Sequence, residues 1–278
     1  MDDASIPSVG LNSGHTMPVL GLGTWTMTDE VADKTVPVAA QLGYRMVDTA
    51  AFYQNERGVG EGIRRSGLPR EDFFVTSKVN GRDQGFDRTL RGCEQTLSRL
   101  GTDYLDLYLI HWPMPMRGLY VETWRAFIRL VEEGYVRSIG VSNFLPAHLD
   151  RIRDETGIVP AVNQIQLHPR IVQQDSRAYA EKQGIVVQSW SPLGQGGKLL
   201  SEPVVQKIAE RHSKSTAQTI LRWHLDQGLV PIPKSADRDR LADNLDVFGF
   251  HLTDEEIEEI TRLNGSEQPM NPETFEQD

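Results

Sequence analysis

The chain contains eight short runs of mostly apolar residues, and polar residues finish each run. Near-continuous apolar runs of this length are typical of strands that are buried on both faces, as in a parallel sheet. The predicted strands are 17–24, 44–50, 73–79, 105–112, 136–143, 161–168, 185–190 and 229–235.

Amphipathic segments separate these runs and predict helices. The clearest predicted helices have apolar residues at helical spacing, a glycine stop signal, or charges that match the helix dipole. These helices are 89–100, 120–134, 215–228 and 252–263. Pro37 is expected to start or kink a further helix. Two apolar segments on either side of Asn12-Ser13-Gly14 predict a hairpin over residues 6–18.

Strand and helix alternate eight times, which predicts an α/β fold of the (β/α)8 TIM-barrel type. The rival is a doubly wound open sheet. Eight strands are many for that fold, and no G-x-G-x-x-G follows the first strand. Because no linker or shift in composition divides the chain, we expect a single domain over 1–278, with an N-terminal hairpin, an extra C-terminal helix and a tail over 265–278.

Charge and composition exclude several classes of function. The formal net charge is −10, which argues against nonspecific binding to nucleic acid or to anionic membranes. Cys93 is the only cysteine, so no intrachain disulfide or thiolate metal cluster is expected, and we predict no metal site. No apolar run reaches the ~18 residues of a membrane span, and the acidic N-terminus lacks an apolar signal core. We therefore expect a cytoplasmic monomer.

Four polar residues lie at or just past the ends of predicted strands: Asp48, Tyr53, Lys78 and His111. In a (β/α)8 barrel the carboxyl ends of the strands meet at one mouth, so these side chains are predicted to converge. An ammonium from Lys78 would lower the pKa of the Tyr53 phenol, and Asp48 would keep that lysine protonated. His111 could orient a substrate oxygen. Such a set can protonate an oxyanion as it forms on a carbonyl, but reduction needs a hydride-donating cofactor.

Several motifs resemble those of the aldo-keto reductases, in the same order along the chain. They are GYRMVDTAAFYQNERGVGEGI, the strand-ending Lys78, LDLYLIHWP, IGVSNF, VNQIQLHP, Ser191-Pro192-Leu193-Gly194 and IPKS. The resemblance runs from residue 6 to residue 265, and VPAVNQIQLHP, LGQG and LRWHLDQG make the chain most similar to bacterial reductases of the 2,5-diketo-D-gluconate reductase type. It implies NADPH-dependent reduction of aldehydes or ketones to alcohols. Tyr53 would be the general acid, tuned by Lys78 and Asp48, with His111 orienting the carbonyl.

The resemblance also implies a nicotinamide site. Ser142, Asn143 and Gln164 carry hydroxyl and amide groups suited to a carboxamide, and the resemblance places them on the nicotinamide. Trp190 ends a strand and could stack on the ring. Backbone N–H groups of a glycine-rich turn can reach a pyrophosphate, and this turn contains Ser191, Leu193, Gly194, Gln195 and Gly196. Gly23, Thr24 and Trp25, at the end of the first strand, are assigned to the same cofactor site.

A local basic patch follows the last predicted strand. A phosphate monoester is suited by a lysine, a hydroxyl and an arginine fork. By resemblance, Lys234, Ser235 and Arg240 bind the adenosine 2′-phosphate and Asn244 contacts the adenine, which favours NADPH over NADH. Asp237 stands where close relatives carry an arginine, and we expect it to weaken this preference.

Aromatic residues after the strand ends predict an apolar substrate mouth. Asn80 stands where many relatives have tryptophan, and the loop between Trp112 and Tyr120 is short. These features favour an open pocket for small or polar carbonyls, α-dicarbonyls or keto-sugars. The predicted lining is Trp25, Phe52, Tyr53, His111 and Trp112.

Two other functions remain as alternatives. A Schiff-base lyase or aldolase on the same barrel would use Lys78 as its nucleophile, although pairing with Asp48 would keep this amine protonated. A nucleotide sensor would bind NADPH without turning over a carbonyl. A glycosidase is disfavoured because the sequence shows no convincing pair of strand-end carboxylates.

Overall fold

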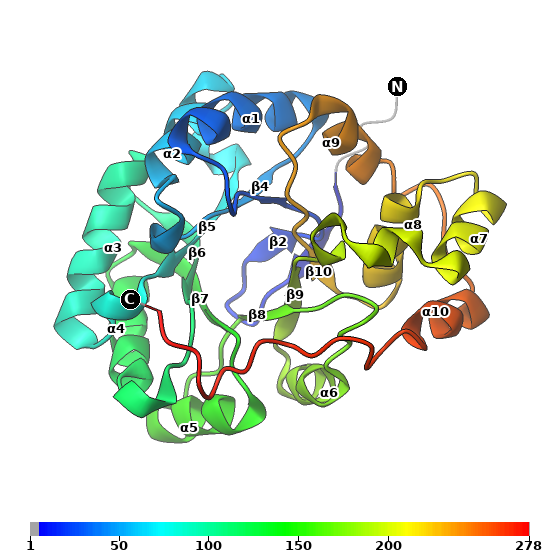
Figure 1. Ribbon diagram of the computed structural model, residues 1–278. Coiled ribbons are helices and arrows are strands. Elements are labelled where there is room, and N and C mark those ends of the chain that lie inside the picture. The colour runs from blue at the N-terminus through cyan, green and yellow to red at the C-terminus, as the bar shows by residue number, and fades with distance from the viewer. Residues whose placement is uncertain (1–5, 278) are drawn as a thin grey trace.

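The strands form a parallel barrel with the helices outside it (Figure 1), in a computed structural model that describes residues 6–277. Neighbouring strands pair in chain order, and all the pairs are parallel. The strands are β3 (Leu22–Gly23), β4 (Met46–Asp48), β5 (Phe74–Val79), β6 (Leu105–Ile110), β7 (Val136–Ser142), β8 (Val162–Gln166), β9 (Val186–Trp190) and β10 (Val230–Pro231).

Backbone hydrogen bonds close the barrel between its first and last strands. The N–H groups of Gly21 and Gly23 donate to the carbonyls of Pro231 and Pro233, at 3.2 and 3.1 Å. A Cβ on Gly23 would lie 2.7 Å from the Ile232 carbonyl oxygen, so this close approach of the two chain segments requires glycine. The predicted (β/α)8 barrel is confirmed.

Helices follow the strands along the chain and surround the barrel (Figure 1). Those that follow β3 to β8 are α1 (Asp29–Leu42), α2 (Glu56–Arg65), α3 (Phe86–Leu100), α4 (Tyr120–Glu132), α5 (Pro146–Thr156) and α6 (Gln174–Gln183). Later come α7 (Pro203–Arg211), α8 (Thr216–Asp226), α9 (Arg238–Leu245) and α10 (Asp254–Thr261). Short 3-10 turns are η1 (Ala51–Tyr53), η2 (Arg70–Asp72), η3 (Gly81–Asp83), η4 (Pro115–Arg117), η5 (Gly194–Gly196) and η6 (Lys198–Ser201). Within residues 6–277, no helix is long and apolar enough to cross a membrane.

The first predicted strand, 17–24, is wrong in extent. Its first residues belong to an antiparallel hairpin of β1 (Ser8–Gly10) and β2 (Thr16–Pro18), and only Leu22–Gly23 enters the barrel. The apolar run is continuous because Met17, although it belongs to the hairpin, also packs into the barrel interior. The predicted hairpin is confirmed. Pro37 lies inside α1, not at its start.

Alternate residues of each strand belong to two separate cores. On β6, Leu107 and Leu109 pack inside the barrel, whereas Tyr108 packs against the helices. On β5, Phe74 points inward and Val75 and Val79 outward. This two-residue period determines which strand-end side chains face the mouth of the barrel.

The C-terminal tail, residues 265–277, crosses the carboxyl end of the barrel from α10 toward α4 (red in Figure 1). The Met270 N–H donates to the Gln166 side chain at the end of β8, and Glu273 pairs with His148 in α5 at 2.9 Å. Glu276 pairs with Arg117 in η4 at 2.7 Å. The described part of the predicted tail therefore covers part of the barrel mouth.

Candidate active site

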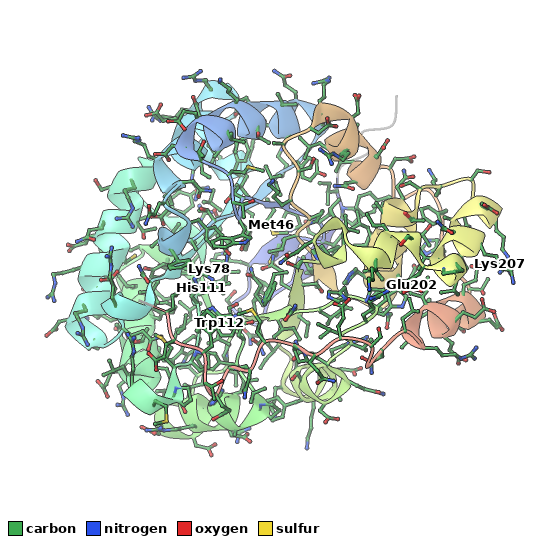
Figure 2. The ribbon with its side chains drawn as sticks, in the orientation of Figure 1. Met46, Lys78, His111, Trp112, Glu202 and Lys207 are labelled. Atoms are coloured by element: carbon green, nitrogen blue, oxygen red, sulfur yellow. The ribbon has the colours of Figure 1, made fainter. Side chains whose placement is uncertain are left out.

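Strand alternation brings Asp48, Lys78 and His111 to the interior of the barrel mouth. Met46 faces inward on β4 and Phe74 faces inward on β5, so Asp48 and Lys78 have the same orientation as these residues. His111 continues the inward face of Leu107 and Leu109 just past β6. Figure 2 shows Lys78, His111 and Trp112 in the same part of the interior.

The four residues predicted to converge do so. The Lys78 ammonium contacts Asp48 Oδ1 at 2.6 Å, donates to the Thr49 carbonyl at 3.0 Å and to the Tyr53 hydroxyl at 3.3 Å. Tyr53 ends η1, and its ring meets the His111 ring edge-on with centroids 5.6 Å apart. Lys78 is completely buried and Asp48 is 2% exposed, so their ion pair lies beneath the phenol and away from solvent.

The Lys78 charge lowers the pKa of Tyr53, as predicted, but the net shift of this pKa is upward. Burial of the hydroxyl raises the pKa of Tyr53 above its ordinary value, the positive charge of Lys78 lowers it, and the negative charge of Asp48 raises it further. The contribution of Lys78 has the predicted sign, but burial outweighs it. Tyr53 is therefore a protonated phenol at neutral pH and can act as a donor.

Lys78 and His111 differ in charge at neutral pH. Burial acts to lower the pKa of Lys78, but the charges and hydrogen bonds of Asp48 and Tyr53 overcome it, and the net pKa is raised. Burial, helped by the nearby Lys78 charge, holds the pKa of His111 well below 6.5. At neutral pH the site therefore contains an ammonium and a neutral imidazole.

Hydrogen bonds join the residues predicted for the nicotinamide. Gln164 Nε2 donates to Asp48 Oδ2 and to Gln188 Oε1, both at 2.7 Å, so Oε1 of Gln164 is the atom that can accept a further N–H. Ser142 donates to the Gln164 carbonyl at 2.8 Å. Asn143 has a left-handed backbone (φ 61°) and accepts the indole N–H of Trp190 at 2.8 Å. These amide edges beside a fixed indole fit a flat ring that carries a carboxamide.

A cavity of about 280 Å³ is lined by Tyr53 and by residues from several strand ends. All the residues predicted for the substrate mouth and for the nicotinamide line it, and three tail residues lie beside them. The lining is Trp25, Phe52, Tyr53, His111, Trp112, Ser142, Asn143, Gln164, Trp190, Ser191, Gln195, Met270, Phe275 and Gln277.

Some residues predicted for the cofactor lie outside this cavity. Gly23 serves barrel closure, and the buried Thr24 donates to the Asp48 carbonyl at 2.9 Å, which ties the end of β3 to β4. In the glycine-rich turn, the N–H groups of Gly194 and Gly196 donate to carbonyls within the turn. The pyrophosphate contact of this turn, which includes Leu193, therefore stays a prediction.

The basic patch lies around the start of α9. Arg240 is exposed, and its Nε lies 3.8 Å from the Asp237 carboxylate, which also caps α9 by accepting the Arg240 N–H at 3.0 Å. Lys234 is exposed, Ser235 is buried and accepts the Asp237 N–H, and Asn244 is buried. One acidic side chain therefore both starts the helix and partly neutralises the guanidinium predicted to bind phosphate.

Sequence reasoning missed the tail residues of the site. Phe275 stacks on Trp112 with ring centroids 3.9 Å apart, and the Gln277 side chain reaches His111. The tail sequence has no periodicity that predicts these contacts. From the sequence, Asn80 and the short loop after Trp112 are interpreted only as signs of an open pocket.

Comparisons with known proteins agree with this geometry. A model of the Aldo/keto reductase family matches residues 19–265. Glyoxal reductase of Bacillus subtilis (strain 168) is 47% identical over 262 residues, 94% of this chain and 94% of the relative. Methylglyoxal reductase DkgA of Yersinia pestis is 43% identical over 274 residues, 98% of each chain. The crystal structure of a Gox0644 mutant in complex with NADPH has a TM-score of 0.94 and 46% identity, and the match covers 98% of this chain and 99% of that one.

Proposed function

We propose, from the premise that this chain belongs to the aldo/keto reductase family of NADP-dependent oxidoreductases, that it reduces small α-dicarbonyl compounds such as glyoxal and methylglyoxal. Keto-sugars form the second group of candidate substrates. Reduction of a carbonyl group with NADPH follows from membership of this family.

One observation carries the chemical part of the proposal. Tyr53 lines the cavity, and its hydroxyl lies 3.3 Å from an ammonium that is ion-paired at 2.6 Å with a buried carboxylate. A neutral phenol in this position can give its proton to a carbonyl oxygen, and Lys78 stabilises the phenolate that remains. His111 orients the oxygen with a hydrogen bond. NADPH supplies the hydride when bound.

The proposed cofactor contacts follow from the side chains around the cavity. Ser142, Asn143 and Gln164 bind the carboxamide, and the Trp190 ring covers the nicotinamide face. Gly23, Thr24, Trp25 and the turn at 191–196 approach the rest of the dinucleotide. Lys234, Ser235 and Arg240 bind the 2′-phosphate, and Asn244 contacts the adenine.

Cavity size supports a small substrate. The volume of about 280 Å³ must hold both the nicotinamide and the substrate, and the tail covers one side. Trp25 and Phe52 stack on each other at the rim with centroids 6.0 Å apart, and Trp112 stacks on Phe275. A two- or three-carbon dicarbonyl fits such a space, whereas a polycyclic ketone would need the tail to move.

The test is NADPH consumption by the purified protein with glyoxal, methylglyoxal, 2,5-diketo-D-gluconate and a polycyclic ketone, with Tyr53→Phe alongside. We expect the two small dicarbonyls to have the highest kcat/KM. Tyr53→Phe should lower kcat by about 10²–10⁴-fold and leave the Kd of NADPH unchanged. A preference for the polycyclic ketone would overturn the substrate class. Unchanged kcat in Tyr53→Phe would overturn the role of the phenol.

A further inference from the structure

The C-terminal tail places a glutamine amide directly against the site histidine. Gln277 is 3% exposed, and its Nε2 lies 3.1 Å from His111 Nδ1. Its Oε1 accepts the backbone N–H of Gly81, at 3.3 Å. This residue lies 166 positions from His111 in the sequence, and none of the predicted site residues belongs to the tail.

The two contacts fix the orientation of the amide. A backbone N–H can only donate, so the group that faces Gly81 must be the oxygen of the Gln277 amide. The NH₂ group then faces His111 and can only donate, so Nδ1 of His111 must accept with its lone pair. The reverse amide orientation would place two donors against each other at Gly81.

Three contacts hold the tail in the position that the hydrogen bond between Gln277 and His111 requires. Phe275 stacks on Trp112, Glu276 pairs with Arg117, and the Gln277 N–H donates to Met114 Sδ at 3.4 Å. A Cβ on Gly81 would lie 2.0 Å from the Gln277 carbonyl oxygen. The bound position of the last tail residues therefore depends on glycine at position 81.

We propose that Gln277 is a positioning residue that holds His111 in the tautomer with its proton on Nε2. A neutral imidazole carries a single N–H, and the amide contact occupies Nδ1, so that proton can only be on Nε2. His111 then presents a hydrogen-bond donor to the carbonyl oxygen of the substrate. This inference rests on the proposed function for the acceptor of that bond, but the tautomer itself is a property of the free protein.

The charges around His111 determine the pH behaviour. Lys78 from β5 opposes protonation of the ring, and the neutral Tyr53 phenol from η1 lies edge-on to it. Asp48 from β4 is already paired with Lys78. In the tail, the Glu276 carboxylate is paired with Arg117. Wild-type His111 therefore stays neutral through the neutral and mildly acidic range.

The decisive variant is Gln277→Glu, which keeps the acceptor for Gly81 and replaces the donor to Nδ1 by a carboxylate oxygen. The imidazole proton then moves to Nδ1, and Nε2 loses its donor. We expect kcat for methylglyoxal near neutral pH to fall by about 10²–10³-fold, the usual effect of removing one oxyanion donor. Lowering the pH should restore activity, because protonation of either the imidazole or the introduced carboxylate gives Nε2–H again. The wild type should show no such rise.

Two controls separate this role from a merely structural one. Gln277→Met fills the same space without hydrogen bonds, so its kcat should fall less, with a flat pH profile. Glu276→Gln weakens the ion pair that helps to hold the tail and keeps Gln277, so any loss of kcat in this variant should have the same flat pH profile as the wild type. If Gln277→Glu has the same pH profile as the wild type, the proposal is wrong.

A second readout does not depend on activity. In protein labelled with ¹⁵N-histidine, the His111 signals are identified by their loss in His111→Gln. Without substrate, Nδ1 should have the shift of an unprotonated nitrogen in the wild type and of a protonated one in Gln277→Glu. A protonated Nδ1 in the wild type would overturn the proposal. The expected shifts without any carbonyl reduction would instead contradict the proposed function alone.

Discussion

The buried ion pair between Asp48 and Lys78 predicts how the free energy of unfolding changes when Asp48 loses its charge. Both carboxylate oxygens are in use, Oδ1 by Lys78 and Oδ2 by Gln164 at 2.7 Å. Asp48→Asn leaves the ammonium buried with no counter-charge, and it places an amide NH₂ against one of two donors. Removing one partner of a buried pair costs about 3–5 kcal/mol. We expect the variant to lose this free energy of unfolding near neutral pH.

The pH dependence of this loss distinguishes a charge effect from a packing effect. In the wild type the folded-state pKa of Lys78 is raised, so its stabilisation is fully present below the unfolded pKa of about 10.4 and is lost as the pH rises through the folded pKa. In Asp48→Asn, burial alone lowers the pKa of Lys78, and the unfolded state binds the extra proton. Stability of the variant then rises with pH, by up to about 1.4 kcal/mol per pH unit. The difference in free energy of unfolding between the wild type and Asp48→Asn should therefore become smaller as the pH rises toward the pKa of Lys78 in the unfolded chain.

The assay is urea unfolding followed by circular dichroism at several pH values between neutral and alkaline. Asp106→Asn is the matched control, because Asp106 is also buried but pairs with Arg70 at 2.8 Å and Arg137 at 3.0 Å. Arginine keeps its proton in this range, so the loss in Asp106→Asn should not change with pH. If the loss of stability in Asp48→Asn is equally independent of pH, the argument that Asp48 holds Lys78 charged is refuted.

Two further predictions concern the ends of the site. Arg240→Ala should weaken binding of NADPH much more than binding of NADH, measured by fluorescence titration, because only NADPH carries the 2′-phosphate; equal weakening would contradict this contact. Gly81→Ala should displace the end of the tail, because the new Cβ would lie 2.0 Å from the Gln277 carbonyl oxygen. Carboxypeptidase should then digest the tail faster than in the wild type. Gly92→Ala in α3 is the control, because its Cβ would meet nothing closer than 3.4 Å.

The barrel and its strand-end residues could be predicted because both depend on local pattern. The apolar runs show which segments are buried on both faces, and a period of two then turns Asp48, Lys78 and His111 to the interior together. Local pattern also misled once, since the run 17–24 is continuous in sequence but divided between a hairpin and a barrel strand. Apolarity reports burial, and Met17 of the hairpin is as fully buried as Leu22 of the barrel strand.

The tail contacts and the net pKa shift of Tyr53 could not be predicted, for two different reasons. Gln277 meets His111 across 166 positions, through a segment with neither helical nor strand periodicity, so only the folded path of the chain reveals it. The pKa of Tyr53 is a balance between burial and two opposite charges. The sequence shows the sign of each charge, but the extent of burial that decides the balance depends on packing.

The charge state of Lys78 also argues against one of the two alternatives that the sequence left open, the Schiff-base lyase. A Schiff-base enzyme needs a neutral amine, which is usually obtained by burying a lysine away from counter-charges or beside another cation. Lys78 is completely buried, but Asp48 lies at 2.6 Å and reverses the effect of burial, so the pKa of the amine is raised. The amine lone pair is consequently bound to a proton, and the hydrogen bonds of Lys78 point to Asp48, Thr49 and Tyr53. Such a lysine can stabilise a phenolate next to it, but it cannot attack a carbonyl.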